Sequence, residues 1–167
     1  MIMQMITILV VLLAVVTIGL IVNGVEDSNK YTKISFKESL DLTDLPVITF
    51  IYGPEKLHFL LDSGANKSVL DERVFNTLNI PLKEDAASMP MYGIEGTPTE
   101  TKICSMTISY KEQDFTSDFC VIDLSAAFDN VKNESGITIH GILGNSFFTK
   151  YKYVLDFDKL VAYNKYK

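Results

Sequence analysis

Residues 57–65 read Leu-His-Phe-Leu-Leu-Asp-Ser-Gly-Ala, an apolar run that ends in a short acidic turn. An Asp-Ser-Gly tripeptide by itself is most often an ordinary turn, because Asp and Ser hydrogen-bond to the nearby backbone and Gly accepts positive φ angles. Here Asp62 follows directly on an apolar strand instead of lying in a polar loop. A second unusual element, Ile-His-Gly-Ile-Leu-Gly at residues 139–144, lies far downstream, and the two elements have to be interpreted together.

The sequence around these two elements is rich in short β-like runs. Residues 47–52 (VITFIY) and 57–61 flank a Gly-Pro-Glu turn signal and predict a hairpin. Residues 71–78 carry an N-cap candidate, early acids and spaced apolar side chains, which predict a short helix that stops before Pro81. Further β-like runs lie at residues 34–36, 103–110, 115–124, 137–143, 153–157 and 160–163. Many short strands separated by turns predict a compact β-barrel or sandwich.

The two elements, in this order, resemble those of the retropepsin-like aspartic proteases. The strand-end motif of that family is hydrophobic-hydrophobic-Asp-Thr/Ser-Gly-Ala, which residues 60–65 match. Its later motif is hydrophobic-hydrophobic-Gly followed by a short helix, which residues 141–148 match, and many members continue with a strand and closing hairpin like residues 153–163. The resemblance spans residues 34–163. The mild departures from the family pattern are Ser63, Asn145 and Phe148.

The resemblance implies an all-β fold, a small closed β-barrel of the retropepsin-like acid protease type with one or two short helices. It also implies that Asp62 is the catalytic residue. Two neighbouring carboxyl groups share one proton, so that one takes a proton from a bound water while the other donates one to the scissile carbonyl oxygen. Ser63 is expected to hydrogen-bond around this dyad, Gly64 to bring its backbone N–H to a carboxylate oxygen, and Ala65 to keep the turn narrow. No cofactor and no metal is expected.

The sequence holds one Asp-Ser-Gly motif, because Asp27-Ser28 is followed by Asn29 and residues 156–158 (DFD) contain no Gly. A dyad therefore needs two copies of the chain, and we expect a homodimer with the two Asp62 side chains at a two-fold axis. The alternative is a catalytically silent retropepsin-like domain that serves as a dimerisation or peptide-binding module on a membrane. The intact acidic motif counts against that alternative.

Residues 91–96 (MYGIEG) fall where this family carries its flap, a glycine-bearing hairpin that closes over the substrate. Glycines in such a loop permit the bends that a lid needs, and an ordinary exposed turn is the alternative. The expected flap residues are Tyr92, Gly93, Ile94, Glu95 and Gly96.

The remaining cysteines and histidines are expected to be structural. Residues 111–114 predict a polar hairpin turn. If its loop has three residues, Cys104 and Cys120 are directly opposed and could touch, and free buried thiols are the equal alternative. His58 and His140 are expected to be packed or solvent-facing and not catalytic.

The first 23 residues form a separate segment, which carries no charge and is apolar from Met5 to Val22. At 1.5 Å per residue this run is roughly 27 Å long, enough to span a bilayer. A cleaved signal peptide is the rival interpretation, but the basic n-region is missing and the run is longer than usual. We expect a single-pass membrane anchor at residues 1–23, a polar tether at 24–33 and the protease domain at 34–167. The charges flanking the anchor leave the side of the membrane open.

Composition excludes several other functions. The net charge of −6, without a cluster of Lys or Arg, is a poor basis for binding nucleic acid. Two Cys and two His are too few and too scattered for a zinc site. Other nucleophile and phosphate-loop signatures are absent. The sequence therefore predicts a membrane-tethered aspartic endopeptidase that acts on a protein or peptide substrate.

Overall fold

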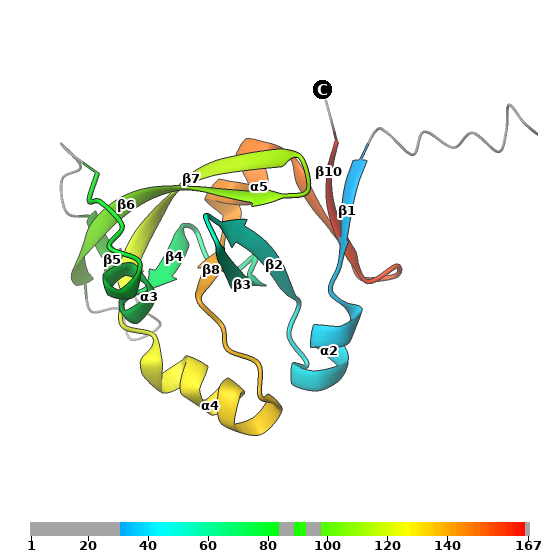
Figure 1. Cartoon of the computed structure of the whole chain (residues 1–167), viewed down its shortest axis with the longest axis horizontal. Coiled ribbons are helices and arrows are strands. Elements are labelled where there is room, and N and C mark those ends of the chain that lie inside the picture. The colour runs from blue at the N-terminus through cyan, green and yellow to red at the C-terminus, as the bar shows by residue number, and fades with distance from the viewer. Residues whose placement is uncertain (1–30, 84–88, 93–97, 166–167) are drawn as a thin grey trace, which may run out of the picture. The chain divides into compact units, whose positions relative to one another are not determined.

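The computed structural model describes residues 31–83, 89–92 and 98–165 (Figure 1). Residues 33–165 form one compact unit. In chain order the elements are β1 (Tyr31–Ser35), α2 (Lys37–Thr43), β2 (Val47–Tyr52), β3 (Glu55–Leu61), β4 (Ser68–Asp71), α3 (Glu72–Thr77), β5 (Met89–Tyr92), β6 (Pro98–Tyr110), β7 (Gln113–Ile122), α4 (Ser125–Ser135), β8 (Gly141–Leu143), α5 (Asn145–Tyr151), β9 (Tyr153–Asp156) and β10 (Val161–Lys165).

Most of the strands form one sheet that closes on itself. Its order is β2-β3-β8-β4-β7-β6-β5, and a further pairing between β2 and β6 joins Ile51 to Ser109. This pairing closes β2, β3, β8, β4, β7 and β6 into a barrel, so the expected all-β barrel is confirmed. A smaller sheet has the order β1-β10-β9. Its first strand begins at Tyr31, inside the segment that the sequence assigned to a tether.

The barrel core combines aliphatic and aromatic side chains, many of which alternate in burial along the strands. Along β3 the side chains of Leu57, Phe59 and Leu61 are buried, and those between them are less so. Phe50 and Phe115 meet in the centre with ring centroids 5.4 Å apart. Burying a side chain of this size stabilises the fold by about 1.5–3 kcal/mol. This alternation of buried and less buried side chains fixes the orientation of β3 up to Leu61, the residue before Asp62.

The helices outnumber the one or two that the sequence predicted. The expected helix at residues 71–78 is α3, whose N-cap Asp71 accepts a hydrogen bond from the backbone N–H of Arg73 at 2.8 Å. The helix expected after the second motif is α5. The additional helices α2 and α4 lie at the same end of the barrel (Figure 1). In α4 a single side chain, Phe128, is buried, and Leu124 and Val131, at helical spacing from it, are partly buried against the same small cluster.

The hairpin of β6 and β7 has a two-residue loop, because Tyr110 pairs with Gln113. With this register Cys104 lies opposite Phe119, and Cys120 lies opposite Ile103. The three-residue loop on which direct opposition depended is therefore not formed, and a shift of one position moves a side chain to the other face of a strand. The equal alternative of free buried thiols is the one that the structure shows. Both cysteines are free and buried, and burial raises the pKa of the Cys104 thiol to about 11.

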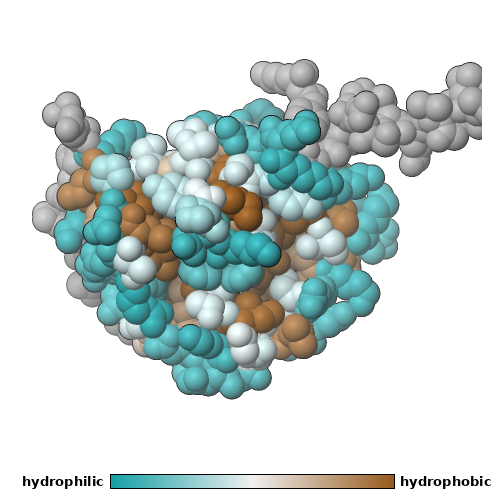
Figure 2. Space-filling view, in the orientation of Figure 1, coloured by the Kyte–Doolittle hydropathy of each residue, from teal (hydrophilic) through white to brown (hydrophobic). Residues whose placement is uncertain are grey.

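The surface shown in Figure 2 is mainly hydrophilic, with hydrophobic residues visible in several places. Three large hydrophobic side chains of the described residues are more than half exposed: Leu42, Leu82 and Phe157. Phe157 nevertheless contacts the buried Phe36, with ring centroids 5.3 Å apart. Isolated exposed side chains of this kind are normal on a globular domain.

The expected membrane anchor at residues 1–23 lies outside the described residues, as does most of the expected tether. Within the described ranges no helix is long and apolar enough to cross a membrane.

Candidate active site

The structure brings the two sequence elements side by side. Strands β3 and β8 are parallel, and Leu61 pairs with Leu143 at the end of both strands. The backbone N–H of Asp62 then donates to the carbonyl oxygen of Leu143 at 3.1 Å. Asp62 therefore lies just beyond the end of β3, beside the end of β8. It is half-buried.

The turn after β3 is organised around the Asp62 carboxylate. The backbone N–H of Gly64 donates to Asp62 Oδ1 at 2.8 Å, and the N–H of Ala65 donates to the carbonyl oxygen of Asp62 at 3.3 Å. A Cβ atom at position 64 would lie 3.1 Å from that same Oδ1, so a side chain would crowd the carboxylate. Ser63 and Gly64 are exposed, and Ala65 is half-buried. This geometry agrees with the role expected for Gly64.

The start of α5 braces this turn from the other side. The backbone N–H of Asn145 donates to the carbonyl oxygen of Ala65 at 2.8 Å, and that of Ser146 donates to the carbonyl oxygen of Asn66 at 3.1 Å. The side-chain amide of Asn145 donates to the carbonyl oxygen of Ser63 at 2.9 Å. Three donors at one helix end therefore hold three carbonyl groups of the acidic turn.

Gly144 makes this close approach possible. A Cβ atom at position 144 would lie 2.6 Å from the carbonyl oxygen of Ala65 and 2.5 Å from that of Lys67. Only glycine fits such a contact without moving the backbone. Ser68 is fully buried, and its Oγ accepts the N–H of Gly144 at 3.2 Å while its own N–H donates to Ser146 Oγ at 3.2 Å.

The sequence drew attention to Gly144 through the second motif but missed the bracing roles of Asn145 and Ser146. Both contacts join residues that are far apart in the chain. The only available signal was that these polar residues follow an apolar strand directly, as the acidic turn does. A hydrogen bond between residues so far apart in the sequence cannot be deduced from local spacing.

The described part of the expected flap is its first strand. In β5, Tyr92 pairs with Pro98 of β6 and Met89 pairs with Thr101, in antiparallel register. Gly93, Ile94, Glu95 and Gly96 lie outside the described residues, so their role stays a prediction.

Asp62 has neither an acidic partner nor a cluster of metal ligands beside it among the described residues. Among the described residues, no second carboxyl group hydrogen-bonds to Asp62. Within the same ranges, no group of three or more His, Cys, Asp or Glu side chains is placed to hold a metal ion.

The two histidines lie near the start of β8, whereas Asp62 follows β3 and lies beside the other end of β8. The backbone N–H of His58 donates to His140 Nδ1 at 2.9 Å, and Thr49 Oγ1 is 2.8 Å from His58 Nδ1. Burial lowers the pKa of both histidines, with Lys56 adding to the effect on His58 and His58 adding to that on His140. They are half-buried packing residues, as predicted.

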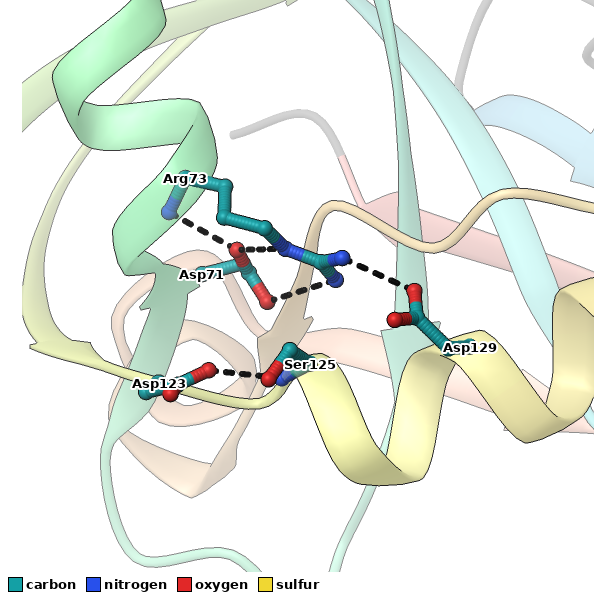
Figure 3. Close-up of polar contacts among 5 residues, drawn as sticks. All are labelled: Asp71, Arg73, Asp123, Ser125 and Asp129. Atoms are coloured by element: carbon teal, nitrogen blue, oxygen red, sulfur yellow. Dashed lines mark hydrogen bonds and ion pairs between the residues drawn. The ribbon is translucent and has the colours of Figure 1, made fainter.

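A second polar cluster links α3 to α4 (Figure 3). Arg73 donates through Nε to the buried Asp71 at 3.0 Å and through Nη1 to Asp129 at 2.8 Å. These bonds, first to Asp71 and then to Asp129, raise the pKa of Arg73. Nearby, Ser125 hydrogen-bonds to Asp123 and lowers the pKa of that carboxyl. The bonds within this cluster satisfy its acids, so we assign it a structural role.

Comparisons with known proteins agree with this geometry. The family model described as aspartyl protease matches residues 49–147. A retropepsin-like aspartic protease from Rickettsia conorii is similar in fold, with a TM-score of 0.52 and 14% identity over 81% of this chain and 90% of that one. No curated protein sequence matches the chain.

Two further solved structures match less well. The EIAV protease in complex with the inhibitor HBY-793 has a TM-score of 0.47 and 23% identity over 64% of this chain and 86% of that one. The retroviral protease-like domain of Ddi1 from Leishmania major has a TM-score of 0.46 and 13% identity over 68% and 82%. The family match, by contrast, covers more than half of the chain and contains both the acidic turn and the Gly144 loop. This chain belongs to the aspartyl protease family and has a retropepsin-like fold.

Proposed function

We propose that the chain is an aspartic endopeptidase, in which Asp62 and Asp62 of a second copy activate a water molecule to hydrolyse peptide bonds. The observation that carries this proposal is the placement of Asp62. It lies at the end of β3, is half-exposed, and has one carboxylate oxygen held by the N–H of Gly64. The other carboxylate oxygen has no hydrogen bond among the described residues and is free to face a water or a second acid.

The chemistry follows from pairing two such groups. Two carboxyl groups in contact do not both ionise, so the pair holds one proton. The ionised member takes a proton from the water as it attacks the scissile carbon, and the protonated member donates its proton to the carbonyl oxygen. Titration belongs to the pair, and the two carboxyl groups exchange roles between steps.

A homodimer supplies the second carboxyl group. Ser63 and Gly64 are exposed in the single chain, so the acidic turn is accessible to a second copy. The sequence provides no second Asp-Ser-Gly motif to play this part within one chain. A two-fold axis through the turn would pair each Asp62 with its counterpart.

The substrate is proposed to be a protein or peptide segment that lies across the dimer, beneath a flap formed by residues 91–96. The register of β5 and β6 supports a hairpin at this place, since Tyr92 and Pro98 are paired. A lid of this kind excludes water from the reacting bond.

The domain is further proposed to be held at a membrane by residues 1–23. The apolar run in this segment is long enough to span a bilayer, and anchoring raises the local concentration that drives dimerisation. We expect the full chain to stay in the membrane fraction after carbonate extraction, and a chain that lacks residues 1–24 to be soluble. Recovery of the intact full chain from the soluble fraction would contradict the anchor.

The central experiment compares the full chain with Asp62→Asn in detergent micelles, using a diverse peptide library as substrate. An amide cannot share or shuttle the proton, so Asp62→Asn is expected to fold normally and to lose cleavage by at least about a hundredfold. Asp27→Asn, in the other Asp-Ser pair, is the matched control because it makes the same change of carboxylate to amide, and it should cleave like the wild type. Equal turnover by Asp62→Asn would exclude the proposal, and a dimeric wild type without cleavage would favour the silent module.

A further inference from the structure

The side chain of Asn145 contacts the acidic turn at the peptide group that joins Ser63 to Gly64. Its side-chain Nδ2 donates to the carbonyl oxygen of Ser63 at 2.9 Å. That carbonyl and the N–H of Gly64 belong to one peptide group. The same N–H donates to Asp62 Oδ1 at 2.8 Å. A continuous chain of two hydrogen bonds therefore runs from Asn145 through one peptide unit to the Asp62 carboxylate.

A peptide group is planar, so a donor that fixes its C=O also fixes the direction of its N–H. A hydrogen bond on the oxygen also polarises the peptide and strengthens the bond that the N–H makes. Both effects favour a charged acceptor, because a carboxylate gains more from an N–H donor than a protonated carboxyl does. Asn145 is thus placed to influence the acid without touching it.

The other hydrogen bonds between α5 and the acidic turn do not act on the peptide group of Ser63 and Gly64. The backbone N–H groups of Asn145 and Ser146 hold the carbonyl oxygens of Ala65 and Asn66, further along the turn. The Ser63 carbonyl instead receives a side-chain donor. Because Asn145 is exposed and the backbone contacts remain, its side chain can be changed while the turn stays attached to α5.

We propose that Asn145 is a positioning residue that aims the Gly64 N–H at Asp62 and so sets the pH at which the proposed dyad becomes active. The part of this inference that concerns the reaction rate rests on the proposed function. The part that concerns the Gly64 N–H does not.

The test follows the Gly64 amide by NMR in the full chain in detergent micelles, labelled with ¹⁵N-glycine so that at most nine amide signals are present. Asn145→Leu removes the donor at similar volume, and Asn145→Asp places an ionised acceptor beside the Ser63 carbonyl. Asn133→Leu, an exposed asparagine on α4, is the matched control. The Gly64 signal is assigned by its absence in Gly64→Ala.

In the wild type and the Asn133 control, the Gly64 amide proton should lie downfield, and its chemical shift should change with pH. In both Asn145 variants it should move upfield and respond less to pH. An unchanged Gly64 signal in Asn145→Leu would overturn the inference. If the signal changes as expected while the wild type cleaves no peptide, the inference stands and the proposed function fails.

Where the wild type is active, the pH dependence of kcat distinguishes positioning from loss of folded protein. Weaker hydrogen bonding to the carboxylate should move the acidic limb of the Asn145→Leu profile to higher pH by about 0.5 to 1. A merely structural defect would lower the rate equally at every pH. A profile of unchanged position would therefore overturn the positioning role even if the rate fell.

Discussion

His140 lies directly before β8 and connects β3 with β4. Its Nδ1 accepts the N–H of His58 at 2.9 Å, and its own N–H donates to the carbonyl oxygen of His58 at 2.8 Å. Its carbonyl oxygen accepts the N–H of Asp71 at 3.0 Å. The imidazole thus supplies an acceptor that β3 would otherwise obtain from a neighbouring strand. An imidazolium has no lone pair on Nδ1, so protonation removes this acceptor.

We predict that this contact makes the fold less stable at acidic pH. Burial, and then the charge of His58, lower the pKa of His140 below its ordinary value of 6.5. The hydrogen bond to the His58 backbone and the nearby Asp71 oppose this lowering, and Lys132 adds to it. The folded chain therefore binds fewer protons than the unfolded chain, and the free energy of unfolding falls as pH drops below about 6.5. His58, whose pKa is lowered by burial and by Lys56, acts in the same direction.

The measurement is urea unfolding between pH 5 and 7.5 for the wild type and His140→Asn. Asparagine retains an acceptor near the Nδ1 position but does not titrate, so the variant should lose part of the pH dependence in this window. Identical pH dependence in the two proteins would show that His140 does not titrate on unfolding.

The sequence predicted single residues well where their role is local. Gly64 is required by the turn that contains it, and its N–H contacts Asp62 two residues away. The role of Asn145 and the specific hydrogen bonds of His140 were not predicted, because each depends on a pairing of distant strands. The parallel alignment of β3 with β8 creates both contacts. Neither Asn145 nor His140 has a property from which this alignment could be predicted.

Arg73 acts between elements, because it joins the N-cap of α3 to the middle of α4 (Figure 3). Asp71 is 1% exposed and accepts from the Arg73 backbone N–H, Nε and Nη2. Asp129 is about half exposed and accepts from Nη1. Loss of Arg73 should therefore have a larger energetic effect at the buried Asp71 than at the exposed Asp129.

We predict that Arg73→Met destabilises the fold by about 1–3 kcal/mol, because it leaves the buried Asp71 carboxylate with the backbone donor alone. Asp129→Asn is the matched control and should cost less than about 1 kcal/mol, because its pair with Arg73 is exposed to water. Urea unfolding at pH 7 measures both. Equal losses in the two variants would show that burial of Asp71 does not decide the outcome.

At the scale of elements, the sequence predicted what local signals specify and missed what tertiary packing decides. The hairpin of β2 and β3 and the helix after Asp71 were confirmed, because turn residues and an N-cap mark them. Helices α2 and α4 were missed. Helix α2 has only seven residues, and the helical spacing of Leu124, Phe128 and Val131 at α4 was not recognised in the sequence. The β6–β7 hairpin turn was expected at the right place, but the three-residue loop considered for it is one residue longer than the loop observed. Turn geometry, in which Lys111 takes a φ of 54°, sets the register.

At the scale of the whole molecule, the proposed mechanism makes the active site a property of two chains. Each site needs one Asp62 from each copy, and the accessible acidic turn is the part of the described surface that the second copy would meet. A variant that dimerises but lacks the carboxylate should then inactivate the wild-type chain with which it pairs. This behaviour separates the dimer from an enzyme that completes its site within one chain.

The last prediction tests this property with a mixture of wild-type and Asp62→Asn chains in equal amounts. After full exchange, about one quarter of the dimers should be wild type, one half mixed and one quarter mutant. Only the first class can hold a proton between two carboxyl groups, so activity should fall to about half of that shown by the same wild-type chains without exchange. Wild-type chains mixed with the Asp27→Asn control should lose no activity. Full activity in the mixture with Asp62→Asn would mean that the second acid comes from within the same chain, and the two-fold site would then have to be abandoned.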